Sequence, residues 1–264
     1  MFFLSRSFGT SEENVAWDDA LIEVADRLAD SIPQPLEALR VWQFPVPTVV
    51  TGRASQIESE VRLEQCIQDH VPVLRRVSGG ASIVAGPGCF MYTLLLSYID
   101  KPFWRSIDVA HREVMSRVAD ATRMACNGNQ QLADRIRIQG VCDLTIDDVK
   151  ISGNALRCKR HTMMYHGTLL VNMPLEWISR YLRLPPRQPE YRNQRDHESF
   201  VRNLFSGDER AKTDSFYLQF AESLQRVWEA SRSWDEFPHQ SILDREVATL
   251  LQSRYQNRDW NLGR

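Results

Sequence analysis

The feature that most constrains the fold is the position of the strand-like segments, which gather in the middle of the chain. Short apolar runs bounded by prolines and glycines predict strands at 38–44, 48–52, 72–77 and 90–98. Further strand patterns fill residues 136–171. Helical spacing dominates the two ends and does not alternate strictly with the strands. The order of elements therefore predicts an α+β fold rather than an alternating α/β fold.

The first helix has a clear start and a clear end in the sequence. Thr10 and Glu13 have the spacing of a capping box, and Pro33 and Pro35 stop the helix. A loop is predicted over 185–195, which is rich in proline and arginine. Periodic apolar residues predict the other helices at 60–68, 107–125, 174–182, 196–204, 214–229 and 239–254.

Bulk properties exclude several classes of protein. The chain has 264 residues, enough for one large domain, and its formal net charge of −2 favours neither nucleic acid nor an anionic membrane as a partner. We expect no membrane span, and the apolar start of the chain stops at Arg6 without a signal-peptide core. The five cysteines lack the spacing of a disulfide framework or a zinc site. We therefore expect free thiols, no bound metal of that kind and a reducing, cytoplasmic location.

A glycine-rich turn follows a predicted strand at 75–80 (Arg-Arg-Val-Ser-Gly-Gly). The strand delivers two guanidinium groups to two adjacent glycines. Glycines let another molecule approach the backbone, and the free amides can bind an anion or an acyl oxygen. The same residues would also suit a plain tight turn with solvated arginines.

Lys150 follows a predicted hairpin. Residues 144–146 and 149–151 are strand-like and flank Asp147-Asp148, which suits a tight turn. A lysine fixed on a strand can neutralise a phosphate or polarise a carbonyl oxygen in a dry pocket. The alternative is an edge-strand lysine that prevents aggregation.

His166 lies beside Gly167 at the start of an apolar strand. A histidine in this position could orient a substrate. It could equally be a hydrogen-bonded structural residue.

Taken together and in order, the segments 11–21, 75–80, 150–155 and 166–170 resemble the lipoate–protein ligase A family. The resemblance covers about residues 10–205. It implies a biotin/lipoate protein ligase-like (class II synthetase-like) fold, with a central mixed, mostly antiparallel sheet flanked by helices. We expect a catalytic domain over 1–205 and a helical extension over 206–264 packed on the same domain.

The resemblance also implies a reaction. Ligases of this family activate lipoate or octanoate with ATP and magnesium, and the acyl-adenylate passes its acyl group to a lysine of a lipoyl-domain protein. The acceptor lysine attacks, so the enzyme must hold a mixed anhydride and stabilise charge on its oxygens. The family's lysine falls on Lys150. The implied acyl- and nucleotide-binding residues are Arg76, Ser78, Gly79, Gly80, Asn154, Arg157 and His166.

The sequence departs from the family pattern at several polar positions. Ala81, Ala85, Gly86, Cys89 and Cys142 replace residues expected on the nucleotide side, which leaves the use of ATP open. The small C-terminal domain of long ligases is not expected to fit in 264 residues, so a separate accessory protein is an open alternative.

Cys142 suggests a second mechanism. Related transferases take octanoyl or lipoyl groups from an acyl carrier protein through a cysteine thioester. A nearby Lys150 ammonium would lower the pKa of Cys142 and make it a possible nucleophile. Cys89 is a weaker candidate, and Cys142 could also be a buried small residue. A non-catalytic acyl- or protein-binding module of the same fold is the third hypothesis.

Two local basic clusters stand out in this nearly neutral chain. They could dock an acidic lipoyl domain or bind phosphates, or they could be solvated loops. Their residues are Arg157, Lys159 and Arg160, and then Arg187, Arg192 and Arg195.

Overall fold

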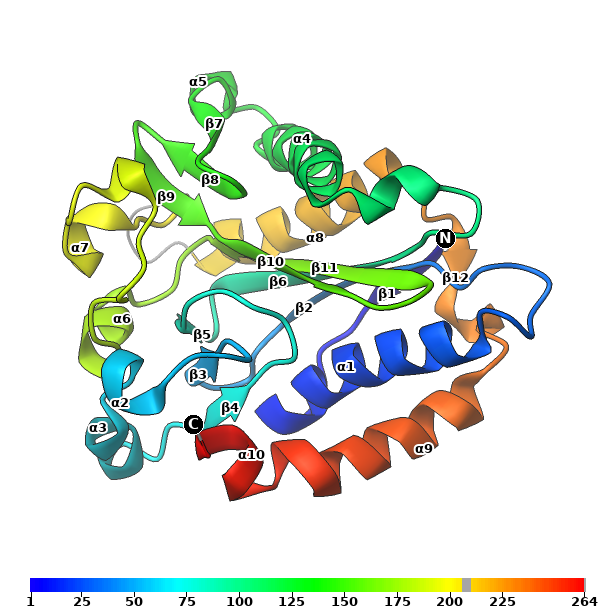
Figure 1. Ribbon diagram of the computed structural model, residues 1–264. Coiled ribbons are helices and arrows are strands. Elements are labelled where there is room, and N and C mark those ends of the chain that lie inside the picture. The colour runs from blue at the N-terminus through cyan, green and yellow to red at the C-terminus, as the bar shows by residue number, and fades with distance from the viewer. Residues whose placement is uncertain (206–209, 264) are drawn as a thin grey trace.

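A six-stranded sheet lies at the centre of the computed structural model, which describes residues 1–205 and 210–263 (Figure 1). Its strand order is β10-β11-β6-β2-β1-β12. The strands from β10 to β2 pair antiparallel, whereas β1 runs parallel to both of its neighbours. The predicted mixed, mostly antiparallel sheet is therefore confirmed. The strand bounds are β1 Phe2–Ser5, β2 Ala38–Gln43, β6 Cys89–Ser97, β10 Asn154–Cys158, β11 Thr162–Leu170 and β12 Arg232–Ser233.

Two three-stranded sheets flank the central one. The sheet β4-β3-β5 carries the glycine-rich turn, and the sheet β7-β8-β9 carries Lys150. The predicted hairpin between β8 and β9 is confirmed, with Asp147 and Asp148 both at positive φ, as a type I′ turn requires. The bounds are β3 Thr48–Thr51, β4 Val73–Arg75, β5 Ile83–Ala85, β7 Ile136–Gln139, β8 Asp143–Ile146 and β9 Val149–Ser152.

Four long helices cover the two faces of the central sheet (Figure 1). Side chains alternate between the faces along β6, so that Phe90 and Tyr92 join one core whereas Met91 and Leu95 join the other. Helices α1 and α9 pack together over the Met91 face, and α4 and α8 over the Tyr92 face. Their bounds are α1 Ser11–Leu28, α4 Ile107–Ala125, α8 Arg210–Val227 and α9 Gln240–Leu250.

The capping box at the start of α1 is confirmed, because Thr10 and Glu13 bond reciprocally through side chain and backbone. Across the described residues, no helix has the length and apolar character needed to cross a bilayer.

The helix predicted over 60–68 is confirmed only from Leu63 onward, as α3. Buried Val61 bridges to Leu182 in extended conformation and separates α2 from α3. The helix predicted over 196–204 is shorter than expected, since Val201 leaves it to pair with Lys150 of β9. The short helices are α2 Ile57–Glu60, α3 Leu63–Gln68, α5 Gln130–Ala133, α6 Glu176–Tyr181, α7 His197–Phe200 and α10 Arg258–Leu262.

The C-terminal part of the chain packs onto the rest. Helix α10 binds the strand before the glycine-rich turn, since the Asn261 side chain accepts a hydrogen bond from the Arg75 amide at 3.0 Å and the Trp260 carbonyl accepts one from its Nε at 3.1 Å. Strand β12 extends the central sheet beside β1. The sequence pattern predicted neither of these two strands. The predicted extension begins with 206–209 and ends with 264, which lie outside the described residues.

Candidate functional site

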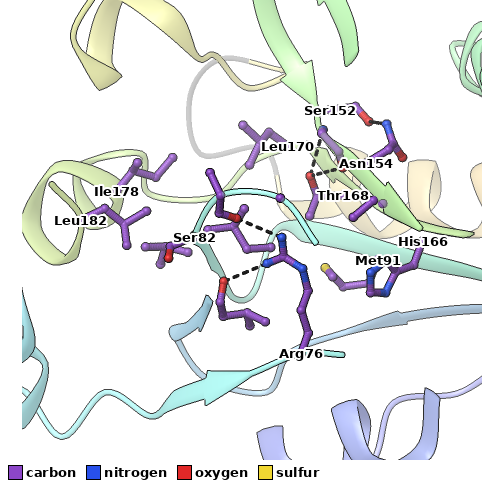
Figure 2. Close-up of a pocket in the computed structure, with 18 of the residues that line it drawn as sticks. Arg76, Ser82, Met91, Ser152, Asn154, His166, Thr168, Leu170, Ile178 and Leu182 are labelled. Atoms are coloured by element: carbon purple, nitrogen blue, oxygen red, sulfur yellow. Dashed lines mark hydrogen bonds between the residues drawn. The ribbon is translucent and has the colours of Figure 1, made fainter. Parts of the chain in front are cut away.

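A pocket of about 220 Å³ lies between the central sheet, the two small sheets and the loop over 185–195 (Figure 2). Trp42, Val50, Met91 and Met164 give it apolar walls from four strands. Polar groups come from β9, β10, the glycine-rich turn and the arginine-bearing loop. An apolar cavity with a few convergent polar groups suits a molecule with an apolar body and one polar end.

Lys150 lies on the wall of this pocket and not in bulk solvent. Its Nζ lies 2.8 Å from Oδ1 of Asp143 on the neighbouring strand β8, and its side chain is only 25% exposed. The other oxygen of Asp143 accepts a hydrogen bond from the Tyr191 hydroxyl at 2.7 Å. A Cβ at Gly153 would lie 2.8 Å from the Lys150 Nζ, so the glycine leaves room for the ammonium. The lysine is therefore held in place by both charge and shape.

Arg76 supports the glycine-rich turn from within. Its guanidinium donates to the Gly79 carbonyl at 2.6 Å, the Ala81 carbonyl at 3.0 Å and the Val50 carbonyl at 3.1 Å. Burial lowers the pKa of Arg76 to about 10, which leaves it charged at neutral pH. Among the described residues, the amides of Gly80 and Ala81 donate to no protein acceptor. These amides could bind the oxygen of a ligand.

Ser78 links Arg76 to His166. The Arg76 Nε donates to Ser78 Oγ at 3.0 Å, and this hydroxyl lies 2.6 Å from His166 Nε2. Burial and the positive charge of Arg76 lower the pKa of His166 to about 3, so its imidazole is neutral at pH 7. Ser78 itself does not line the pocket and reaches it through His166.

Asn154 is bonded within the pocket wall. Its Nδ2 donates to the Cys142 carbonyl at 2.6 Å, and its Oδ1 accepts from the Tyr92 hydroxyl. Gly167 on the adjacent strand is required here, since a Cβ there would lie 1.7 Å from the Asn154 Oδ1. Asn154 therefore supports the wall as well as lining it.

Four predicted residues lie outside the pocket lining, namely Ser78, Gly79, Arg157 and Cys142. The expectation that the pKa of Cys142 is lowered overall is wrong, although Lys150 does act in that direction. Burial and the Asp143 carboxylate outweigh the ammonium and raise the pKa of the thiol to about 11. Burial also raises the pKa of Cys89 to about 12. Neither cysteine is an activated thiolate.

The second predicted basic cluster is partly at the site. Arg187 and Arg192 line the pocket, whereas Arg195 does not. Phe200, which also lines the pocket, and Tyr191, which holds Asp143, were missed because they lie outside the recognised motifs, in a predicted helix and a predicted loop. Asp143 directly precedes the predicted strand over 144–146, but only pairing of β8 with β9 shows that it faces Lys150.

The fold is that of the lipoate–protein ligases. The structure of a bi-partite lipoate protein ligase from Thermoplasma acidophilum, described with its E2 lipoyl domain, superposes with a TM-score of 0.75 and 18% identity, covering 99% of this chain and 96% of that one. The structure of a lipoate-protein ligase A bound with ATP superposes with a TM-score of 0.71 and 16% identity. The match covers 99% of this chain and 98% of that one. Because identity is this low, the likeness establishes the fold alone.

The chain belongs to the family described as the lipoyl protein ligase A/B catalytic domain, whose sequence model matches residues 10–225. The match confirms the family predicted from the four motifs. It also reaches further than the resemblance, which covered about residues 10–205.

Curated relatives are longer than this chain. Lipoate-protein ligase LplJ of Bacillus subtilis is 24% identical over 222 residues, which cover 83% of this chain and 62% of LplJ. Lipoate-protein ligase A of Psychrobacter cryohalolentis is 23% identical, with 82% of this chain and 61% of the relative covered. The chain thus spans about three-fifths of the length of these relatives.

Proposed function

We propose that this protein is a lipoate–protein ligase that attaches a lipoyl or octanoyl group to a lysine of a lipoyl-domain protein. The observation that carries the proposal is the Lys150 ammonium, fixed by Asp143 on the wall of an apolar pocket. Family membership and the ATP-bound structural relative support the same chemistry.

The pocket suits an acyl chain that ends in a carboxylate. The chain would lie against Trp42, Met91 and Met164, and burial of this apolar surface would supply most of the binding energy. The carboxylate would then meet Lys150 and the amides of Gly80 and Ala81. The lysine needs no proton transfer for this role, because it acts as a fixed positive charge.

Acyl activation requires a nucleotide in the same pocket. A carboxylate oxygen would attack the α-phosphorus of ATP, and pyrophosphate would leave. Magnesium would enter bound to the substrate phosphates, because both oxygens of Asp143, the carboxylate beside Lys150, are already bonded to Lys150 and Tyr191 and Asp143 does not line the pocket. Magnesium would neutralise phosphate charge, whereas Lys150 would stabilise the oxygens of the mixed anhydride.

Transfer then needs only an acceptor amine. The deprotonated lysine of a lipoyl domain would attack the acyl carbonyl, form the amide and release AMP. The neutral His166, bonded to Ser78, cannot add a competing positive charge to the wall. The role of this pair is to position the glycine-rich turn. We infer a cytoplasmic location from the free cysteines, and an accessory protein remains part of the proposal.

The thioester mechanism has less support. A thiol whose pKa is raised to about 11 has little thiolate at neutral pH, and Cys142 does not line the pocket. An acyl carrier protein is therefore the less favoured acyl donor.

Two measurements test the proposal. Lipoate-dependent exchange of radiolabelled pyrophosphate into ATP reports acyl-adenylate formation. The intact mass of a lipoyl domain incubated with this protein, lipoate and ATP reports transfer. A carrier-dependent acyl adduct on Cys142 without exchange would favour the transferase. Absence of both, with lipoate still bound, would favour a binding module.

A further inference from the structure

Three cationic side chains surround the ring of Phe200 at the pocket wall. Arg192 lies 4.5 Å from the ring centroid, Arg195 5.3 Å and the Lys150 ammonium 6.0 Å. Phe200 is 3% exposed, so the ring is a buried platform shared by the three cations. Their charges differ in how they are balanced.

Arg195 and Lys150 are both held by contacts within the protein. Arg195 donates to the carbonyls of Tyr191 and Asp148 at 2.9 Å each, which fixes the loop over 185–195. Lys150 has the Asp143 carboxylate at 2.8 Å. Lys150 is therefore paired with an anion, whereas Arg195 is held by carbonyl oxygens and does not line the pocket.

Arg192 is buried without a described carboxylate in ion-pair contact, although Asp196 attracts it from further away. It is 4% exposed, yet no carboxylate of the described residues lies within ion-pair distance. The nearby Asp196 accepts from the Ser199 amide at 2.8 Å and caps α7. A buried guanidinium without an anion in contact is costly, and an anionic ligand would offset that cost.

The remaining contacts of Arg192 orient it and leave donors free. Its Nε donates to the Arg195 carbonyl at 2.9 Å. His197 Nε2 donates to the Arg183 carbonyl at 3.1 Å, so Nδ1 is the acceptor for Arg192 Nη2 at 3.4 Å. Within the described residues, Arg192 Nη1 has no acceptor, although the residue lines the pocket.

We propose that Arg192 binds the polyphosphate end of a nucleoside triphosphate, next to the Lys150 that holds the acyl phosphate. This deepens the proposed function and rests on it. The guanidinium, oriented by Phe200 and His197, would donate to the β- or γ-phosphate oxygens. These hydrogen bonds would break when the pyrophosphate leaves the pocket. An acidic protein surface fits less well, because a folded domain cannot reach a side chain that is 4% exposed inside a pocket.

Tripolyphosphate and lipoate, each titrated alone into the full chain by calorimetry, test the subsite. Arg192→Gln should weaken tripolyphosphate binding about tenfold or more while lipoate affinity stays unchanged. Arg192→Lys should bind tripolyphosphate with intermediate affinity, because it keeps the positive charge but loses the planar guanidinium that can donate two parallel hydrogen bonds to a phosphate. Arg245→Gln, an exposed arginine on α9, is the matched control and should bind both probes as the parent does.

Three outcomes would overturn this subsite. In the first, Arg192→Gln binds tripolyphosphate as tightly as the parent does. In the second, the parent does not bind tripolyphosphate. In the third, Arg192→Gln loses lipoate affinity as well, which would mean that Arg192 is only structural. Weakened binding of an acidic lipoyl domain with unchanged tripolyphosphate affinity would assign Arg192 to protein docking instead. These measurements need no turnover. If exchange and acyl transfer both fail while tripolyphosphate binding still depends on Arg192, the ligase proposal fails and the anion site stands.

Discussion

The Nζ of Lys150 lies 2.8 Å from Oδ1 of Asp143, and the two residues come from adjacent strands of one hairpin. The pair aims a positive charge along a pocket wall that also holds His166 and the glycine-rich turn. The catalytic assignment depends on this placement.

Removing the ammonium should abolish acyl transfer without unfolding the protein. We expect Lys150→Ala to reduce transfer by at least about 100-fold, since a fixed charge on the reacting oxygens is lost. The pair is partly exposed, so the free energy of unfolding should fall by about 1 kcal/mol or less. Mass spectrometry of the lipoyl domain and thermal melting measure the two effects.

Lys101→Ala provides the control for that variant. It breaks an ion pair of the same 2.8 Å length with Glu37, on the surface away from the pocket. Transfer should be unchanged. A collapsed melting temperature in Lys150→Ala alone would show that Lys150 is a structural residue.

Gly153→Ala should displace the lysine and spare the fold. The new Cβ would lie 2.8 Å from Nζ and 2.9 Å from Cε of Lys150, and the end of a flexible side chain can move aside. A misplaced charge should reduce transfer about tenfold or more, with little change in melting temperature. Gly9→Ala, whose Cβ would meet only Glu13 at 3.6 Å, is the control. Full activity in Gly153→Ala would contradict the assigned position of Lys150.

Cys142→Ser should keep the activity. With a pKa of about 11 the thiol is protonated at pH 7.5, so its replacement should change turnover by less than about threefold. Iodoacetamide should also alkylate Cys142 more slowly than the exposed Cys158. Loss of transfer in the serine variant, together with a trapped acyl-enzyme, would restore the thioester mechanism.

His166 should make stability depend on pH. Its pKa is about 3 in the folded state, against about 6.5 in the unfolded chain, so the unfolded chain binds the proton more readily between these values. The free energy of unfolding should therefore fall as the pH drops below about 6.5. His166→Gln should reduce this slope by up to about 1 kcal/mol per pH unit.

Urea denaturation at several pH values measures that slope. His111→Gln offers the comparison, because Asp108 partly opposes the effect of burial on the pKa of His111. Its change of slope should be smaller. An unaltered slope in His166→Gln would mean that this imidazole is solvated rather than buried beside Arg76.

The sequence by itself determined the family, the mixed sheet and the element that carries the lysine. These follow from local signals: the capping box at Thr10, the Asp147-Asp148 turn and the order of four motifs. The capping box, the turn and each single motif consist of residues that are near one another along the chain, where turn geometry and side-chain periodicity act directly.

Only the tertiary structure decided which charges are balanced. Asp143 faces Lys150 because β8 pairs with β9, and Tyr191 reaches Asp143 from 48 residues away. The same packing raises the pKa of Cys142, although its neighbour in space is a lysine. It also leaves Arg192 buried beside Phe200, with no described carboxylate in ion-pair contact. Burial and long-range pairing set these electrostatic outcomes, and neither is encoded in the spacing of residues along the chain.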